Sequence, residues 1–255
     1  MPNVGDKPMI DNCFKVEKLN VTIDSNQILN NIDFSSKTGS ITCITGVSGI
    51  GKTTLLKTVG QIIDKTSGNI SLRGNPINNK ELKIGYVPQD HGLYSWLKVK
   101  SNILLPCKIK KMQPKESLFK EIVDNLGISH LADRYPNNLS GGEKQRVALA
   151  RGMILNPEIL LVDEAFSSLD ALSKLSGYNL FLSLHERFKP TTLVITHDLD
   201  EALYLADSIV VLSRGECRQL DNKAKGHKKT DKIYLEHLSI VETLVRGEDF
   251  DEKHY

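Results

Sequence analysis

Cysteines are few in this sequence of 255 residues, and they lie far apart. Cys13, Cys43, Cys107 and Cys217 form no CxxC pair, and no histidine lies near them at the spacing of a zinc site. This spacing argues against both a disulfide framework and a zinc-binding fold. We therefore expect reduced, buried or incidental thiols in a cytosolic protein.

Long apolar runs are also missing. Residues 1–15 contain no apolar stretch of the kind found in signal peptides. No segment approaches the ~20 apolar residues that a membrane helix needs. We expect neither a signal peptide nor a transmembrane helix, so any action on a membrane must take place from outside the bilayer.

Charge of one sign is not in excess. The chain has 33 basic and 31 acidic residues, a formal net charge of +2, so its overall electrostatics do not favour nucleic acid as a partner. Lysine clusters of this kind are most often solvated faces. Two such clusters are present, at Lys108, Lys110 and Lys111 and at Lys223, Lys225, Lys228 and Lys229.

The periodicity of apolar residues predicts an α/β core. Strand patterns are predicted at residues 16–23, 28–34, 40–45, 69–73, 84–87, 159–162, 191–196 and 208–212. Helical stretches separate the last three, and this alternation is typical of a parallel sheet with crossover helices. A helix is also predicted after Gly51, with one apolar face formed by Leu55, Leu56, Val59, Ile62 and Ile63.

Between residues 89 and 157 the strand pattern fades and helices are predicted instead. One helix opens at Pro114 and stops at Gly127, with Leu118, Phe119, Ile122 and Leu126 on one side, and a second follows Gly142. We expect residues 1–88 and 158–222 to form a nucleotide-binding core, and residues 89–157 to form an inserted helical subdomain.

Residues 223–255 form a tail. The tail begins with a polar, lysine-rich stretch and continues with an amphipathic helix. Packing of this helix on the core is favoured over binding to a partner. Its predicted apolar residues are Ile233, Leu238, Val241 and Val245.

A glycine-rich loop follows the third predicted strand. Residues 46–53 match G-x-x-x-x-G-K-[ST] at every fixed position. The glycines let backbone N–H groups converge on phosphate oxygens, because a Cβ atom would block that approach. The helix that follows would direct its N-terminal dipole at the same anion. We expect Lys52 to reach the β- and γ-phosphates of ATP and the Thr53 hydroxyl to bind Mg²⁺.

The second candidate site motif is an apolar run, residues 159–162, that ends abruptly in Asp163 and Glu164. A run without alternation is typical of a strand buried on both faces. Ligands of open α/β sheets bind at the carboxyl ends of the strands. We expect Asp163 to hold Mg²⁺ through water and Glu164 to orient and deprotonate the attacking water. A plain helix start with acids in its first turn is the alternative.

A second glycine loop precedes the acidic strand. In residues 139–143, Ser140 and Glu143 form an S-x-x-E capping box around two glycines, which predicts another helix N-terminus with exposed N–H groups. One chain needs no second loop of this kind for a single nucleotide. Two copies arranged head to tail would use both loops.

Taken in order over about residues 14–215, these motifs resemble those of the ATP-binding subunits of ABC transporters. The resemblance implies a P-loop ATPase of the ABC type, with a mainly parallel sheet core, an N-terminal antiparallel β portion and an inserted helical lobe. The segments that carry it are the phosphate loop, Gln89, the signature 139–146, the acidic strand 159–164, the segment Ser168-Leu169-Asp170, and His197.

The resemblance also implies a role for each motif. Two copies of the chain would close on two ATP molecules, each held by one phosphate loop and by Ser140 and Gly142 of the other copy. His197 would contact the γ-phosphate and the water held by Glu164, and Gln89 would pass the state of that phosphate to the helical lobe. Taken alone, Gln89 would be interpreted as part of a turn and His197 as a helix cap.

The full set of expected site residues follows. The catalytic residues are Lys52, Gln89, Glu164 and His197; the nucleotide-binding residues are Gly46, Val47, Ser48, Gly49, Ile50, Gly51, Lys52, Thr53, Thr54, Ser140, Gly141, Gly142 and Asp170; and the metal ligands are Thr53, Gln89 and Asp163. The expected cofactors are ATP and Mg²⁺. Asp170 is expected to bridge the two chains.

The function implied is that of an energy-coupling ATPase of an importer. It would act as a homodimer on the cytoplasmic face of the membrane, bound to an integral membrane permease, with a substrate-binding protein in the full system and no nucleic acid. Residues 91–97 and 198–202 are most similar to importers of nitrate, sulfonate or taurine. A soluble ABC ATPase outside transport and a nucleotide-binding regulator without turnover are the alternatives. A soluble ABC ATPase usually has fused cassettes or long coiled-coil insertions, and this sequence shows neither. The intact catalytic residues argue against a regulator without turnover.

The expected adenine contact departs from the pattern of the family. ABC ATPases usually stack adenine on an aromatic residue where this chain has Ile23, and no aromatic occurs between Phe14 and Phe34. Losing that stacking forfeits about 1 kcal/mol, so we expect weakened selectivity for adenine over guanine.

The segment 91–97 contains the only tryptophan of the sequence, Trp96. It is either an exposed docking groove for a membrane partner or part of the core of the helical lobe.

Overall fold

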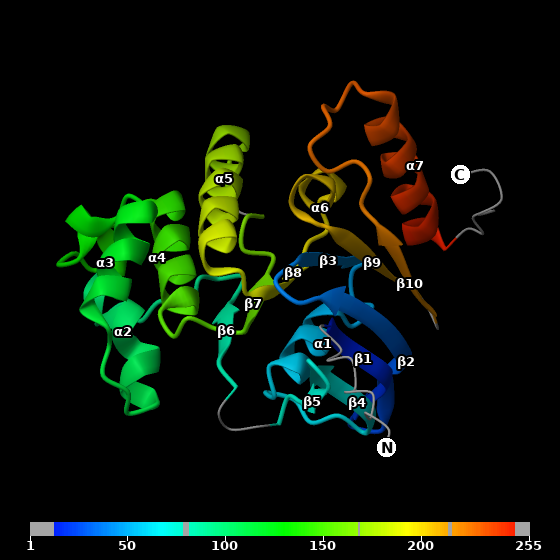
Figure 1. Ribbon diagram of the computed structural model, residues 1–255, viewed down its shortest axis with the longest axis horizontal. Helices are drawn as coiled ribbons and strands as arrows, with labels where there is room; N and C mark the ends of the chain where they lie inside the picture. The colour runs from blue at the N-terminus through cyan, green and yellow to red at the C-terminus, as the bar shows by residue number, and fades with distance from the viewer. Residues whose placement is uncertain (1–12, 79–81, 168, 214–215, 248–255) are drawn as a thin grey trace, which may run out of the picture.

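The computed structural model describes residues 13–78, 82–167, 169–213 and 216–247, which form two sheets and a group of helices (Figure 1). The strands are β1 (Cys13–Ile23), β2 (Asn26–Lys37), β3 (Ile41–Gly46), β4 (Ser67–Leu72), β5 (Asn75–Pro76), β6 (Ile84–Val87), β7 (Ile159–Asp163), β8 (Thr191–Ile195), β9 (Ser208–Ser213) and β10 (Glu216–Asp221). The α-helices are α1 (Lys52–Val59), α2 (Val99–Ile109), α3 (Glu116–Asn125), α4 (Gly141–Met153), α5 (Ala171–Phe188), α6 (Leu199–Leu205) and α7 (Lys232–Arg246), with short 3₁₀ turns at Ser129–Leu131 and Pro136–Asn138.

The larger sheet has the strand order β10-β9-β3-β8-β7-β6. The strands β9, β3, β8, β7 and β6 run parallel, and β10 pairs antiparallel with β9 at one edge. The smaller sheet, β2-β1-β4-β5, is antiparallel throughout. The predicted fold, a mainly parallel core with an N-terminal antiparallel portion, is therefore confirmed.

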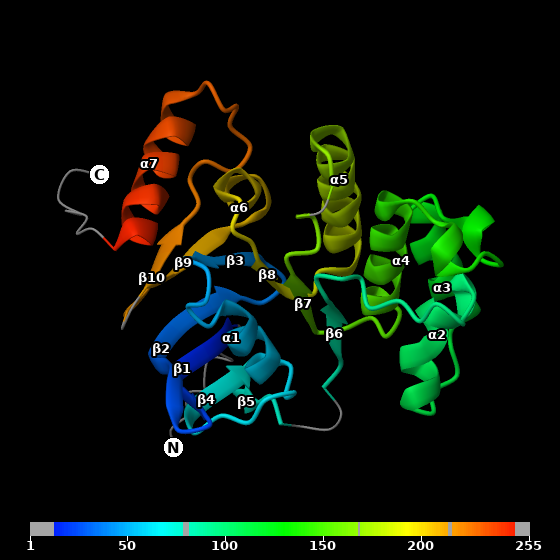
Figure 2. The same cartoon turned by 180° about the vertical axis from the view of Figure 1, so that it is seen from behind.

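Each strand of the larger sheet sends alternate side chains into two separate cores. On one face, residues such as Ile44, Leu161 and Ile195 pack with α1 and the antiparallel sheet. On the other face, residues such as Leu160 and Val194 pack with the remaining helices. Burial on both faces explains why residues 159–162 of β7 are apolar without alternation. Figures 1 and 2 show α1 between the two sheets.

The helices α2, α3 and α4 gather on one side of the larger sheet, next to β6 (Figures 1 and 2). The sequence did not predict α2, which contains Pro106 and has no side-chain cap at its start. Its first turn is held instead by a tertiary contact, since the N–H groups of Val99 and Lys100 donate to the carbonyl oxygens of Arg134 and Ala132. The helix predicted to open at Pro114 begins at Glu116.

Two apolar faces differ from those predicted. Helix α1 ends at Val59, with Gly60 as its C-cap, so Ile62 lies beyond it and is 61% exposed. In α7 the buried positions are Tyr234, His237, Ile240, Val241 and Leu244, whereas Ile233 is exposed. Helix α7 packs against α6 and β9. The residue ranges given above for the core, the helical subdomain and the tail stay predictions.

The thiols of Cys43 and Cys107 are buried, in β3 and α2. Burial raises the pKa of both thiols, which keeps them protonated at neutral pH. Burial was one of the alternatives expected from the sequence, and it applies to these two thiols, whereas Cys13 and Cys217 are partly exposed.

Candidate functional site

The glycine-rich loop, residues 46–51, joins β3 to α1 at the carboxyl end of the parallel sheet. Gly46 has φ 148°, and a Cβ atom there would lie 2.3 Å from the carbonyl oxygen of Leu212. Gly51 has φ 106°, and its Cβ would lie 2.8 Å from Leu29 Cδ2. The backbone can follow this path only with glycine at both positions. Thr53 and Thr54 lie in the first turn of α1, at the same end of the helix as the loop.

Lys52 is the buried cation of this loop. Its Nζ donates hydrogen bonds to the carbonyl oxygens of Gly46, at 2.8 Å, and Val47, at 2.9 Å. Burial lowers the pKa of the ammonium group, and the nearby carboxylates of Glu164 and Asp163 partly oppose that shift. The structure thus holds a partly desolvated positive charge inside the loop.

Asp163, at the end of β7, meets the start of α1. The Thr53 hydroxyl donates to Asp163 Oδ1 over 3.3 Å, and the Tyr86 hydroxyl donates to Oδ2 over 3.1 Å. Burial raises the pKa of Asp163, while these two hydrogen bonds lower it. A hydroxyl and a carboxylate in contact are oxygen ligands of the type that Mg²⁺ prefers, so Thr53 and Asp163 fit that ion.

Tyr86 was missed by sequence reasoning. It lies on β6, and its contact with Asp163 exists only because β6 pairs in parallel with β7. A tyrosine within an otherwise apolar strand was the only available signal, and it did not identify the partner.

Glu164 contacts two other predicted catalytic residues, Gln89 and His197. Its Oε2 accepts a hydrogen bond from Gln89 Nε2 at 3.2 Å and lies 3.2 Å from His197 Nδ1. Its backbone has φ 44°, and its N–H donates to the carbonyl oxygen of Ile195 at 3.0 Å. A non-glycine residue in this conformation is uncommon and is often found at a functional site. Gln89 contacts Glu164; its role as a metal ligand stays a prediction.

The second glycine loop begins α4 and contains the predicted capping box. The Ser140 hydroxyl accepts from the Glu143 N–H, and the Glu143 carboxylate accepts from the Ser140 N–H. Among the described residues, a Cβ atom on Gly142 would meet nothing within 4 Å, and one on Gly141 would meet only Leu169 Cδ2, at 3.8 Å. This helix start is therefore open on its outer side. Its role toward a nucleotide stays a prediction.

Asp170 serves as the N-cap of α5. One carboxylate oxygen accepts the backbone N–H groups of Leu172 and Ser173, and the other accepts the Ser173 hydroxyl. These bonds lower the pKa of the carboxyl. The predicted bridge from Asp170 to a second chain stays a prediction, and Ser168 lies outside the described residues.

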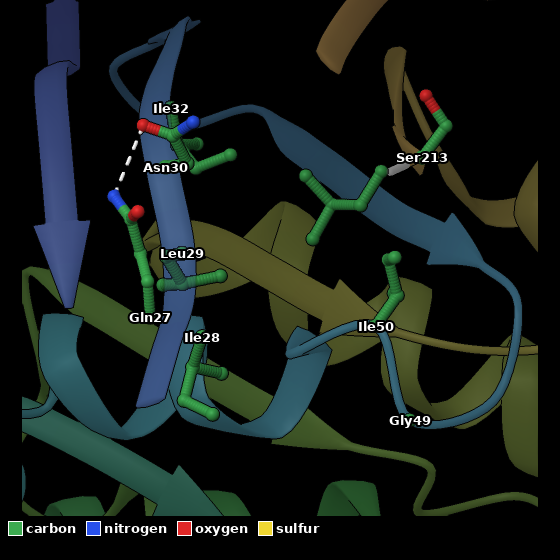
Figure 3. Close-up of a pocket in the computed structure, with 9 residues that line it drawn as sticks. Gln27, Ile28, Leu29, Asn30, Ile32, Gly49, Ile50 and Ser213 are labelled. Atoms are coloured by element: carbon green, nitrogen blue, oxygen red, sulfur yellow. Dashed lines mark hydrogen bonds between the residues drawn. The ribbon is translucent and has the colours of Figure 1, made fainter. Parts of the chain in front are cut away.

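A pocket of about 370 Å³ lies between β2 and the phosphate loop (Figure 3). On the strand side it is lined by Ile28 and Leu29 and by the amides of Gln27 and Asn30; Gly49 and Ile50 line it on the loop side. None of the described residues that line this pocket is aromatic. Ile23, at the position where an aromatic residue was expected, ends β1 and is 36% exposed.

Tyr94 and Trp96 are exposed, so these two rings are not part of the core of the helical lobe, whereas Leu93 packs against that core. The docking of a membrane partner on this segment stays a prediction. Trp96 is 71% exposed, and its ring meets that of Tyr94 edge to face at 5.1 Å. The loop is anchored from α4, because the guanidinium of Arg151 donates to the carbonyl oxygens of His91 and Gly92. An anchored loop that displays two aromatic rings is typical of a protein-binding surface.

Within the described residues, no helix is both long enough and apolar enough to cross a bilayer.

The chain has a clear family relationship with known proteins. The sequence profile of the family described as "ABC transporter" matches residues 29–167. Sulfate/thiosulfate import ATP-binding protein CysA of Escherichia coli (strain K12) is 35% identical over 237 residues, 88% of this chain; the chain spans 65% of that relative's length. Aliphatic sulfonates import ATP-binding protein SsuB of Bacillus thuringiensis subsp. konkukian is 37% identical over 233 residues, 86% of this chain and 92% of the relative.

Solved structures agree with this relationship. The protein cbiO1 of Clostridium perfringens, part of the ABC transporter complex cbiONQ, superposes with a TM-score of 0.74 at 25% identity, covering 91% of this chain and 94% of the other. A dimeric ATP-binding cassette in a post-hydrolysis state, bound to ADP and Pi, superposes with a TM-score of 0.72 at 27% identity, covering 82% and 99%. Because the profile covers more than half of the chain, this chain belongs to the ABC transporter family and is an ATP-binding domain of that family.

Proposed function

We propose that this chain is the ATP-hydrolysing, energy-coupling subunit of an ABC importer. The observation that carries the proposal is the cluster in which Glu164 contacts both Gln89 and His197, beside the contact between Thr53 and Asp163. That cluster pairs a carboxylate able to accept a proton from water with ligands suited to Mg²⁺.

Each residue has a distinct task in hydrolysis. Lys52 would exchange the loop carbonyls of Gly46 and Val47 for phosphate oxygens. The Mg²⁺ that accompanies ATP would be held by Thr53 and Asp163, and it supplies charge that neutralises the phosphates. Glu164 would accept the proton of the attacking water, and His197 would hold Glu164 and the γ-phosphate in register.

A second copy of the chain would complete the site. The N-terminus of α4 is open on its outer side at Gly141 and Gly142 among the described residues, and the first N–H groups of a helix are of the kind that bind phosphate. In a head-to-tail homodimer this end would cover the phosphates held by the other copy. Dimer closure would then depend on ATP and would open again after hydrolysis.

The partner in the membrane would be an integral permease, docked on the exposed segment around Trp96 at the cytoplasmic face. The relatives described above are named for sulfate, thiosulfate and aliphatic sulfonates. A small oxyanion, with sulfonates as the favoured class, is therefore the substrate we propose for the whole transporter. Nitrate and taurine rest on the sequence resemblance alone, as does a substrate-binding protein in the full system.

The test is the substitution Glu164→Gln. It keeps the shape of the side chain and the contacts to Gln89, but it removes the proton acceptor. We expect ATP binding to persist, hydrolysis to fall at least about 100-fold, and an ATP-bound dimer to accumulate in size-exclusion chromatography. Glu186→Gln, at an exposed position on α5, is the matched control. Turnover at the wild-type rate in Glu164→Gln would remove Glu164 from the mechanism and, with it, this proposal.

A further inference from the structure

The residue His197 lies in a turn between β8 and α6. The Thr196 hydroxyl accepts the N–H of Asp198 at 3.0 Å, and Asp198 caps α6 by accepting the N–H of Glu201 at 3.2 Å. These bonds define the backbone of the turn. Glu164 follows a different strand, and its N–H donates to the carbonyl oxygen of Ile195, which joins Glu164 to the end of β8 but not to the side chains of the turn that follows.

Helix α5 holds this turn at two points. Lys174 Nζ lies 3.0 Å from Asp198 Oδ2, and the Tyr178 hydroxyl donates to Glu201 Oε2 at 3.1 Å. Lys174 and Tyr178 are four residues apart, so they project from the same face of α5. One helix face therefore contacts the acid that follows His197 and the acid in the first turn of α6.

The Tyr178 ring also contacts the segment that carries Glu164. It meets the Phe166 ring edge to face, with the ring centroids 5.1 Å apart, and Phe166 is fully buried two residues after Glu164. Tyr178 thus touches one segment with its ring and the other with its hydroxyl. A single side chain spans the two segments whose ends meet at the contact between Glu164 and His197.

We propose that Tyr178 and Glu201 are positioning residues for ATP hydrolysis: their buried hydrogen bond fixes the His197 turn relative to Glu164. The proposal rests on the proposed function, because it takes Glu164 and His197 as the groups that act on the attacking water. Neither Tyr178 nor Glu201 is assigned a contact with nucleotide or metal.

The surroundings of Glu201 favour this role over simple structural support. Glu201 is 2% exposed, and its Oε1 has no hydrogen-bond partner of good geometry among the described residues, although the Thr196 hydroxyl lies close enough to lower the pKa of the carboxyl. An incompletely satisfied buried carboxylate costs folding free energy. The charged and titratable groups that face it are Lys174 and Tyr178 from α5, Asp198 from its own turn and Cys43 from β3.

The ionisation of Glu201 provides a specific readout. Burial raises the pKa of this carboxyl to about 7. The ionised form accepts the stronger, charge-assisted hydrogen bond from Tyr178. The turn is therefore held most firmly above neutral pH, and its hold weakens as Glu201 takes up a proton.

The first experiment compares Tyr178→Phe with Tyr204→Phe. Both substitutions remove one hydroxyl and keep the ring; the Tyr204 hydroxyl joins α6 to α5 through Asn179 at 2.8 Å, on the surface. We expect Tyr178→Phe to lower kcat about tenfold, with the KM for ATP and the binding of a fluorescent ATP analogue unchanged. Tyr204→Phe should match the wild type. An unchanged kcat in Tyr178→Phe, or an equal loss in both variants, would overturn the proposal.

The second experiment records kcat against pH for the wild type and Glu201→Gln. The wild-type kcat is expected to rise through a step near pH 7, and Glu201→Gln should be slower and lack that step. A step that persists in Glu201→Gln belongs to another group and contradicts the proposal. If Glu164→Gln stalls hydrolysis while the Tyr178 and Glu201 variants behave as wild type, the positioning role alone fails. If Glu164→Gln hydrolyses ATP normally, the proposed function fails first.

Discussion

The Nδ1 atom of His197 lies 3.2 Å from Oε2 of Glu164, although the two residues follow different strands. They meet because β7 and β8 are parallel neighbours, so that both strands end at the same edge of the sheet. The N–H of Glu164 also donates to the carbonyl oxygen of Ile195, which ties the two strand ends together. The sheet pairing thus brings the two strand ends together, and α5 contacts the turn that carries His197 through Lys174 and Tyr178.

Replacing His197 tests this contact directly. In His197→Ala, Glu164 keeps its place at the end of β7 but loses the imidazole that orients it. We expect kcat to fall about 100-fold and the affinity for ATP to change little, because the phosphate loop is untouched. Steady-state ATPase assays and nucleotide titrations measure the two effects separately. His227→Ala, a surface histidine near Asp231, serves as the control, and equal activity in both variants would contradict the role of His197.

Base selectivity is the second prediction. Neither Ile23 nor the pocket between β2 and the phosphate loop offers an aromatic surface for a purine. The missing stacking corresponds to about 1 kcal/mol, so GTP is expected to compete with ATP at concentrations only a few-fold higher. Ile23→Tyr should strengthen ATP binding about fivefold. Competition titrations with both nucleotides give these values.

The control for base selectivity is Ile62→Tyr, which adds the same ring at another exposed isoleucine. It should leave the ratio of ATP to GTP affinity unchanged. A wild-type protein that strongly prefers ATP would show that another group recognises adenine.

The third prediction concerns stability and pH. Burial raises the pKa of Glu201 from 4.5 to about 7, so the folded chain holds this proton more tightly than the unfolded chain. The resulting stabilisation is fully present below pH 4.5 and is lost as the pH rises through 7. Glu201→Gln has no such loss. As the pH rises from 4.5 to 7, the free energy of unfolding of Glu201→Gln should therefore increase by about 3 kcal/mol relative to that of the wild type.

Urea unfolding at pH 5 and pH 8 measures this gain. Glu186→Gln, on the exposed end of α5, should show no comparable gain. A Glu201→Gln variant that is more stable at pH 8 and yet slower in hydrolysis cannot owe its slowness to unfolding. If the free energies of unfolding of the wild type and Glu201→Gln change with pH in the same way, Glu201 has the same pKa in the folded and the unfolded chain.

The fourth prediction concerns the membrane partner. Trp96 is 71% exposed beside Tyr94, on a loop anchored by Arg151. Large aromatic residues commonly dominate binding at such surfaces, with losses of at least about 2 kcal/mol on truncation. Trp96→Ala is therefore expected to reduce co-purification of the permease strongly while the ATPase activity of the isolated chain stays the same. Ile62→Ala, at another exposed apolar position, should keep the permease bound.

Much of the candidate site was accessible from the sequence, because its parts are local. The glycine loop at residues 46–53 and the capping box of Ser140 and Glu143 depend on residues a few positions apart. The acids Asp163 and Glu164 are marked by the apolar strand that precedes them. Local backbone geometry determines such features, so their residue types and spacing suffice to predict them.

Other elements depended on distant contacts. Helix α2 carries Pro106 and has no side-chain cap, and its start is stabilised by hydrogen bonds from the N–H groups of Val99 and Lys100 to the carbonyl oxygens of Arg134 and Ala132. Strand β10 exists as the antiparallel edge of β9. The buried face of α7 is set by the surfaces of α6 and β9, which is why Ile233 is exposed and Tyr234 is buried.

The sequence by itself thus determined the phosphate loop, the acidic strand and the second glycine loop, and with them the kind of site. Only the tertiary structure decided that Tyr86 contacts Asp163, that Trp96 is exposed, and that Tyr178 joins Glu201. The physical reason is range: a loop or cap depends on dihedral angles and hydrogen bonds within a few residues. A contact between side chains on different elements depends on how sheet pairing and core packing place those elements.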